Sequence, residues 1–107
     1  MQDKLPPLTS LQFLILSVLQ DDERPGRDIR TALARFGARR SAAAFYQTMA
    51  RLERARLIEG WYEQITVGDQ AVTERRYRLR PAGSRQLQET RAFYERAASL
   101  AKRVSNA

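Results

Sequence analysis

The stretch from Ser41 to Ile58 limits the possible folds of this chain more than any other, because it has the marks of an amphipathic helix. Ser41 is a preferred residue for a helix N-cap, and the residues after it include many strong helix formers and neither Gly nor Pro. Phe45, Met49 and Leu52 recur at i, i+4 and i+7, which places three apolar side chains on one face. We therefore predict a helix of about four turns that packs this face against a core.

The opposite face of this predicted helix has the residue types that suit contact with DNA. Small side chains at its N-terminal end allow close approach of the backbone, an amide can pair with a base edge, and guanidinium groups bind phosphates. The residues that we predict to bind DNA through this helix are Arg39, Arg40, Ser41, Ala43, Ala44, Tyr46, Gln47 and Arg51. Among them, Gln47 is best suited to a bidentate contact with adenine.

The composition favours a single domain with an anionic partner. The chain has 107 residues, 43% of them hydrophobic, and a formal net charge of +7. All but two of its 19 cations are arginine, whose planar fork suits phosphates and guanine edges, although a GC-rich genome also raises arginine content. We therefore expect double-stranded DNA as the partner, with a lipid surface as the less favoured anion.

Several functions lack the residues that they need. The chain contains no Cys and no His, which removes thiol and imidazole catalysis, disulfides and the usual zinc sites. Asp21, Asp22 and Glu23 are adjacent acids without further ligands, and we interpret them as a solvated turn. We expect no enzymatic activity, no catalytic residues, no metal and no cofactor. The longest apolar run, Phe13 to Leu16, is too short to span a bilayer, so we expect a cytoplasmic protein without membrane contact.

The N-terminal part is predicted to form an arm followed by two helices. Residues 1–7 include two prolines and are expected to be a flexible arm. Thr9 or Ser10 caps a first helix, and a second helix from Arg27 to Phe36 follows a Pro-Gly break and ends in a left-handed cap at Gly37. The core stripe of the first helix comprises Leu11, Leu14, Ile15, Val18 and Leu19. Leu8, Phe13 and Leu16 lie outside it and are available to a second partner. The core stripe of the second helix comprises Ile29, Leu33 and Phe36.

A β-hairpin is predicted directly after the helix that begins at Ser41. The segments Leu57–Val67 and Thr73–Leu79 are rich in aromatic and β-branched residues, and Gly68 and Asp69 supply turn chemistry between them. The two preceding helices, joined by a short turn, read as a helix-turn-helix. A hairpin in this position is a wing.

The wing carries the other cations that we predict to bind DNA. Alternation along its second strand turns Tyr77 inward, and we expect Arg75 and Arg76 to meet phosphates. An alternative is that these cations only pair across the strands with Glu59 or Glu63.

The last predicted helix is expected to make a dimer. Pro81 suits its first turn, and the helix runs to about Ser105 within a segment that we assign as 81–107. Its apolar residues alternate at spacings of three and four, as in the seam of a helix pair. At 1.5 Å per residue it is about 35 Å long, more than a small winged domain covers; the alternative is a helix folded back wholly on its own domain. The residues predicted at the dimer interface are Leu87, Phe93, Tyr94, Ala97, Leu100, Ala101 and Val104.

The predicted fold class is mainly α with a small β-hairpin: a winged helix-turn-helix domain over residues 8–80 and a long C-terminal dimerisation helix. From Leu8 to Leu100 the chain resembles the PadR family of transcriptional regulators. The resemblance lies in the pieces LTSLQFLILSVL, PGRDI, AFYQTMARLERARLI and RRYRLRPAG, in which the family pattern falls on Tyr46, Arg51, Leu52 and Glu53, and on Tyr77, Leu79 and Gly83.

The resemblance implies a homodimer that represses transcription by binding a roughly palindromic operator with its third helix and wing. It also implies that a small aromatic or drug-like effector near the dimer interface releases DNA in some members. Four residues depart from the family pattern, among them Arg27 at an often aromatic position and Arg80 in place of a frequent threonine cap. Gln47 stands where proline is common and leaves a free amide, and Arg56 stands where glycine is usual. A left-handed Arg56 would cost about 1 kcal/mol, so we expect a reshaped helix end there.

The competing interpretation is a winged-helix module for protein–protein interaction that does not read DNA. Such a module has no need of arginines both at the N-terminus of the third helix and on the wing. Because this chain has both, we favour DNA binding.

Overall fold

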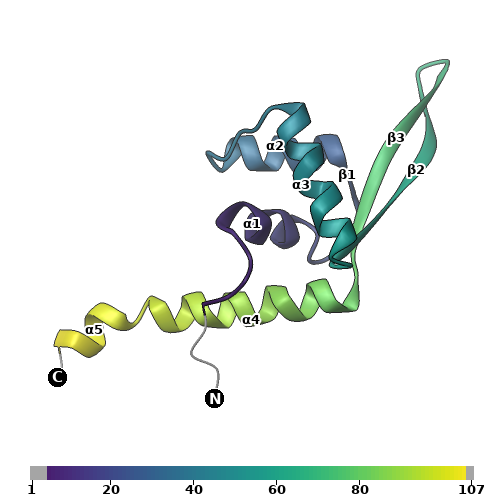
Figure 1. Ribbon diagram of the computed structural model, residues 1–107. Coiled ribbons are helices and arrows are strands. Elements are labelled where there is room, and N and C mark those ends of the chain that lie inside the picture. The colour runs from purple at the N-terminus through teal and green to yellow at the C-terminus, as the bar shows by residue number, and fades with distance from the viewer. Residues whose placement is uncertain (1–4, 106–107) are drawn as a thin grey trace.

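Three helices form the body of the protein, a long hairpin projects from one side, and a C-terminal helix runs along its base (Figure 1). The structure, a computed structural model, describes residues 5–105, so that residues 1–4 of the predicted arm lie outside the described part. The elements are α1 (Ser10–Val18), β1 (Arg24–Pro25), α2 (Gly26–Arg35), α3 (Ala42–Arg54), β2 (Ile58–Val67), β3 (Gln70–Leu79), α4 (Pro81–Ala97) and α5 (Leu100–Ser105).

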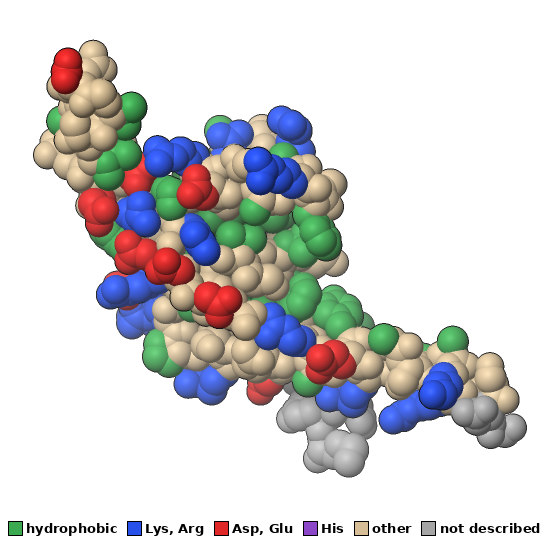
Figure 2. Space-filling view, turned by 180° about the vertical axis from the view of Figure 1, so that it is seen from behind, with side chains coloured by type: hydrophobic (Ala, Val, Ile, Leu, Met, Phe, Trp, Pro, Cys, Tyr) green, Lys and Arg blue, Asp and Glu red, His purple; other side chains and the backbone are tan. Residues whose placement is uncertain are grey.

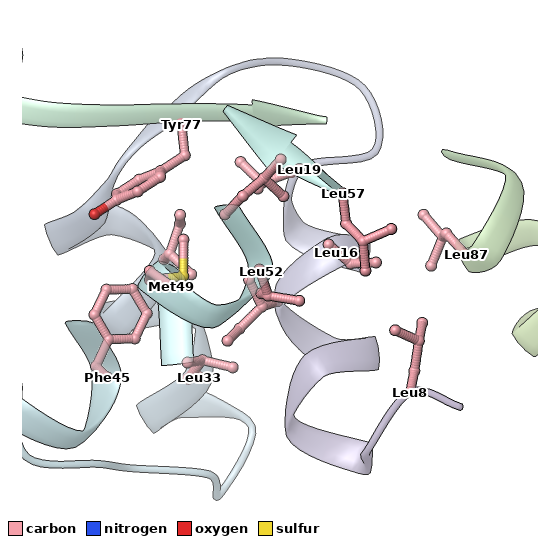
Figure 3. Packing of buried hydrophobic residues seen from close by; sticks show 13 residues of the cluster. Leu8, Leu16, Leu19, Leu33, Phe45, Met49, Leu52, Leu57, Tyr77 and Leu87 are labelled. Carbon is pink, nitrogen blue, oxygen red and sulfur yellow. The ribbon is translucent and has the colours of Figure 1, made fainter. Parts of the chain in front are cut away.

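Helix α1 begins where the sequence predicted, but it presents a different face to the core. The Thr9 side chain accepts a hydrogen bond from the Gln12 backbone, and the Gln12 side chain accepts one from the Thr9 backbone, which closes a capping box. Leu16, predicted outside the core stripe, is fully buried, whereas Leu11 and Leu14 are only partly covered. Figure 3 shows the reason: Leu16 and its neighbours turn toward Leu87 of α4, a partner that periodicity within one helix cannot reveal.

The segment before α2 forms a strand where the sequence predicted only a break. In β1, Arg24 and Pro25 pair with Tyr77 and Arg76 of β3, so that the sheet has the order β1-β3-β2. Helix α2 starts one residue earlier than predicted, at Gly26.

The end of α2 corrects one predicted core residue. Ile29 and Leu33 are buried as expected, but Phe36 is 73% exposed. The helix ends at Arg35, and Gly37 takes a positive φ of 84° that turns the chain away, so the i+7 spacing no longer places Phe36 on the core face. The predicted left-handed cap at Gly37 is confirmed.

Helix α3 follows its predicted start and packing closely. The Ser41 hydroxyl accepts a hydrogen bond from the Ala44 backbone at 3.2 Å, and Phe45, Met49 and Leu52 are buried in the core.

The C-terminal end of α3 is not reshaped, contrary to our expectation. Arg56 has a φ of 60° and occupies the left-handed position itself. Its backbone donates to Glu53 O at 2.9 Å, and Leu57 donates to Leu52 O at 3.1 Å, which is the paired hydrogen bonding of a Schellman cap. The helix therefore ends in a Schellman cap whose left-handed residue is Arg56, and the backbone at Arg56 is strained.

The predicted hairpin is confirmed and is longer than expected. Strands β2 and β3 pair antiparallel from Ile58 with Leu79 to Val67 with Gln70, leaving a two-residue turn. Gly68, at the first turn position, has a φ of 62°, which fits a turn type that requires glycine there. Tyr77 is buried as predicted, and the hairpin projects beyond the body (Figure 1).

The helical C-terminus is confirmed but falls into two segments. Helix α4 ends at Ala97, and α5 begins at Leu100 after an interruption that the sequence did not predict. The Ser99 hydroxyl donates to Arg96 O at 2.7 Å, and Ser99 O accepts from Arg103, so this serine ends one helix and caps the next.

The first half of α4 belongs to the core of its own domain. Leu87, predicted at the dimer interface, is 0% exposed and packs in the core cluster, so it has no surface to offer a second subunit. At Gly83 a side chain would run into the Leu57 backbone, which shows how closely α4 approaches the start of β2. The second half of α4 and α5 extend away from the body (Figure 1), and the molecule measures 65 × 27 × 24 Å.

Candidate nucleic-acid interface

The outward face of α3 is open and free of acidic side chains. Ser41, Ala43, Gln47 and Arg51 are exposed, and Ala44 is half-buried at the edge of the same face. From Arg39 to Arg51 the sequence contains no Asp or Glu. This face therefore combines small residues, one amide and arginines, as predicted, and its N-terminal residues lie at the positive end of the helix dipole.

Side-chain bonding leaves the amide of this face free. The Thr48 hydroxyl donates to Ala44 O at 3.1 Å and so turns back onto its own helix. The Gln47 carboxamide has no hydrogen-bond partner among the described residues. An exposed amide with both polar atoms available is suited to a bidentate contact with a base edge.

Tyr46 links α3 to α2 as well as reaching the surface. Its ring lies edge-on to Phe45, with ring centroids 4.9 Å apart, and it remains 40% exposed. A Cβ at Gly26 would lie 2.8 Å from the Tyr46 hydroxyl, so a larger residue there would require the Tyr46 ring to shift. The predicted DNA residue Tyr46 is thus also a spacer between the two helices.

The wing arginine Arg75 is held against α3. Its guanidinium lies 2.6 Å from the Glu53 carboxylate and 4.6 Å from the ring centroid of Tyr62. Beside it, burial raises the pKa of Tyr77 to about 12. Arg75 joins the wing to the third helix instead of pointing freely into solvent.

Arg76 is surrounded by carboxylates. It lies 2.6 Å from Glu74, 3.1 Å from Glu23 and 3.9 Å from Glu63, and its side chain is only 19% exposed. The hydrogen bond to Glu74 raises the pKa of the Arg76 guanidinium. One of the three adjacent acids that we interpreted as a solvated turn, Glu23, therefore has a structural partner.

All three arginines of the wing are paired, but only partly across the strands as the alternative interpretation proposed. Cross-strand partners serve Arg78 and, at 3.9 Å, Arg76, whereas Arg75 pairs with Glu53 of α3. Arg78 lies 2.7 Å from Glu59 and its guanidinium stands over the Trp61 ring. Beyond Glu63 and Glu74 the hairpin contains no Lys or Arg, and Asp69 occupies its turn. Figure 2 shows carboxylates gathered around the base of the wing and arginines gathered at the end of the domain that carries α2.

A cationic hollow on α2 was not predicted. Its lining consists of Arg27, Arg30, Thr31, Ala34, Arg35, Arg39 and Arg40. The signal was present in the sequence, because the α2 members recur at i, i+3, i+4, i+7 and i+8 and so share one face of the helix. We call it the α2 hollow.

Apart from Leu87, the predicted dimer residues leave an apolar strip at the surface. Phe93 and Ala97 are half-buried, Tyr94 is 40% exposed and Val104 is 73% exposed. The Tyr94 ring packs on Phe13 of α1, with ring centroids 5.3 Å apart. Leu100 and Ala101 continue the exposed strip along α5.

Residues 5–105 contain neither a membrane-spanning helix nor a cluster of metal ligands. No helix there is long and apolar enough to cross a membrane. No group of three or more His, Cys, Asp or Glu side chains in that range is placed to hold a metal ion.

The arrangement of α2, α3 and the β2–β3 hairpin defines a winged helix-turn-helix protein. No protein-family model matches the chain, and no curated protein matches its sequence. Solved structures do match, and several of them are PadR-family transcriptional regulators.

Three of these structures illustrate the likeness. A PadR family regulator from Clostridium difficile has 17% sequence identity and a TM-score of 0.77, over 90% of this chain and 98% of that one. One from Eggerthella lenta has 26% identity and a TM-score of 0.67, over 89% and 80%. Bacillus subtilis PadR in complex with operator DNA has 21% identity and a TM-score of 0.63, over 78% and 46%. The protein thus has the fold of the PadR-family regulators.

Proposed function

We propose that this protein is a PadR-family transcriptional regulator that binds double-stranded DNA and represses transcription. The observation that carries the proposal is the outward face of α3, where exposed small and amide side chains lie beside arginines that form no ion pair with any described residue. The fold shared with an operator-bound PadR protein adds support.

In this proposal α3 enters the major groove by its N-terminal end. The exposed Gln47 amide reads adenine, and the methyl groups of Ala43 and Ala44 meet thymine methyls. Arg39, Arg40 and Arg51 bind the flanking phosphates and supply most of the affinity.

We assign the wing arginines a smaller share of the binding energy than the sequence suggested. To reach a phosphate, Arg75 has to leave Glu53, and Arg76 has to leave Glu23 and Glu74. Breaking those pairs offsets much of what a phosphate contact contributes. Their main task in the proposal is to hold the wing against the domain.

The proposal includes a homodimer that covers the apolar strip of α4 and α5. Tyr94, Leu100 and Val104 together expose apolar surface on a helical arm that the domain itself does not cover. Two-fold pairing of this arm would place two α3 helices on half-sites about ten base pairs apart. Light scattering should give twice the chain mass for the wild type and the single chain mass for a Leu100→Glu/Val104→Glu variant.

The effector belongs to the same proposal. A hollow along α4 is lined by Leu5, Pro6, Pro7, Glu89, Thr90, Ala92, Phe93 and Arg96. Thr90 is 1% exposed, and its hydroxyl has no hydrogen-bond partner among the described residues. We propose that a small aromatic molecule binds in this hollow, which adjoins the predicted dimer seam, and thereby weakens the binding of the protein to DNA.

The test is a genomic pull-down with the purified protein at physiological salt, followed by sequencing of the retained fragments. We expect a two-fold repeated motif, and Gln47→Ala should relax the preference at one base step by about 1 to 3 kcal/mol. Gln88→Ala, the same truncation at an exposed position of α4, serves as the control. Retained fragments without any shared motif would favour the protein-interaction module instead.

A further inference from the structure

The α2 hollow concentrates five arginines on one face of α2 and in the turn after it. It encloses about 460 Å³ and has no acidic side chain in its lining. Arg27 is already paired, with Glu74 at 2.8 Å. The other four lining arginines form no ion pair with any described residue. Clustered like charges repel one another, and a bound anion relieves that repulsion.

Arg30 adds a second sign of a missing acceptor. Its Nε atom is buried and has no hydrogen-bond partner among the described residues. A buried donor without an acceptor is destabilising, and nearly all such groups in folded proteins are satisfied. An oxyanion in the α2 hollow would bind the Arg30 guanidinium, whose planar fork suits a phosphate in particular.

The α2 hollow is continuous with the predicted DNA surface. Arg39 and Arg40 belong to its lining and stand directly before Ser41, the cap of α3. A phosphate held there would lie beside the end of α3 that enters the groove. The wing offers no comparable site, because its arginines are paired and its outer half has none.

We propose that the α2 hollow binds a phosphate group through Arg30, Arg35 and Arg39, and that this protein anchors the DNA backbone from α2 rather than from the wing. The DNA part of this proposal rests on the proposed function. A phosphate carried by a free small molecule has the same chemistry, so the test separates the two sources.

The first arm measures how the affinity of the full chain for a DNA duplex depends on salt. Each phosphate contact that is lost lowers the slope of log affinity against log salt by about 0.9. We expect Arg35→Gln to lower it by about one such step, Arg30→Gln/Arg35→Gln by about two, and all sequences to weaken alike. Arg85→Gln, an exposed charge removal on α4, is the matched control and should leave the slope near the wild-type value.

Geometry and folding are checked with the same variants. Arg30→Lys keeps the charge but loses the fork and its Nε, so it should weaken binding nearly as much as Arg30→Gln. Circular dichroism establishes that each variant folds. If the double variant does not fold, Arg35→Gln still decides the outcome, because the Arg35 side chain is exposed.

The second arm titrates the wild type and both variants with inorganic pyrophosphate by calorimetry. A lowered DNA slope without pyrophosphate binding assigns the α2 hollow to DNA phosphate. Pyrophosphate binding that the variants lose, with the DNA slope unchanged, assigns it to a free phosphate compound. If the wild type binds DNA and neither effect is seen, the α2 hollow is not a phosphate site. If the wild type binds no DNA, the proposed function fails, and pyrophosphate binding alone decides the α2 hollow.

Discussion

Replacing Arg56 with glycine should stabilise the protein, although it removes a side chain from the surface. Arg56 has a φ of 60°, where a residue with a Cβ loses roughly 1 to 2 kcal/mol relative to glycine. Glycine also lowers the free energy of unfolding by about 0.5 to 1 kcal/mol, because it makes the unfolded chain more flexible. The Arg56 side chain is exposed and forms no ion pair among residues 5–105, so little else is lost. We expect a net gain of about 0.5 to 1 kcal/mol in the free energy of unfolding.

The assay is thermal and urea unfolding at one fixed protein concentration, since a dimer makes the midpoint concentration-dependent. The expected gain corresponds to a rise of roughly 2 to 6 °C in Tm. Arg56→Ala removes the same side chain but keeps the Cβ, so it should leave Tm nearly unchanged. Arg54→Gly, two residues earlier and in the last turn of α3, should lower stability by about 0.5 to 1 kcal/mol. If Arg56→Gly gained nothing over Arg56→Ala, the strain argument would be wrong.

Two further predictions concern the packing around the wing. Gly83→Ala should lower the free energy of unfolding by roughly 1 to 3 kcal/mol or more, because its Cβ would run into the Leu57 carbonyl. Thermal unfolding checks this, with Ser84→Ala as the control. An equal Tm for the two variants would contradict the prediction. Tyr77, with its pKa raised to about 12 from 10.0, holds its proton more tightly in the folded state, so its contribution to stability is present below pH 10.0 and is lost as pH rises toward 12. Tyrosinate absorbance should show a late step that Tyr77→Phe removes.

The parts of the fold that the sequence predicted correctly depend on local signals. The caps at Thr9 and Ser41, the left-handed Gly37 and the hairpin turn at Gly68 each follow from residues within one turn of the position concerned. Such signals act over a few residues, and nothing distant in the chain overrides them here.

The errors arose where distant parts of the chain meet. The covered face of α1 was misplaced because α1 packs against α4, far away in sequence. Leu16 and Leu87 are both buried in the shared core, and burial removes Leu87 from the predicted dimer interface. Arg56 was expected to reshape its helix end, but the Schellman hydrogen bonds outweigh the strain of one residue.

The sequence predicted which elements carry the candidate site but not which of its arginines are neutralised by carboxylates. Alternation along β3 placed Arg76 on the correct strand but could not reveal that Glu23, 53 positions earlier, would neutralise it. The α3 face could be proposed from the sequence because its residues lie close together on one helix. The α2 hollow combines one face of a helix with the turn that follows it. Pairing between distant charges is the information that a single sequence does not contain.

The glycine at position 83 has a mechanical consequence. With no side chain between α4 and the first residues of β2, the joint between the C-terminal helix and the wing has no soft layer that could absorb movement. Helix α4 is about 25 Å long at 1.5 Å per residue, so it acts as a lever arm fixed at this joint. A rotation of its far end, where the apolar strip lies, would therefore reach the wing through the direct contact between the helix and the backbone at Gly83.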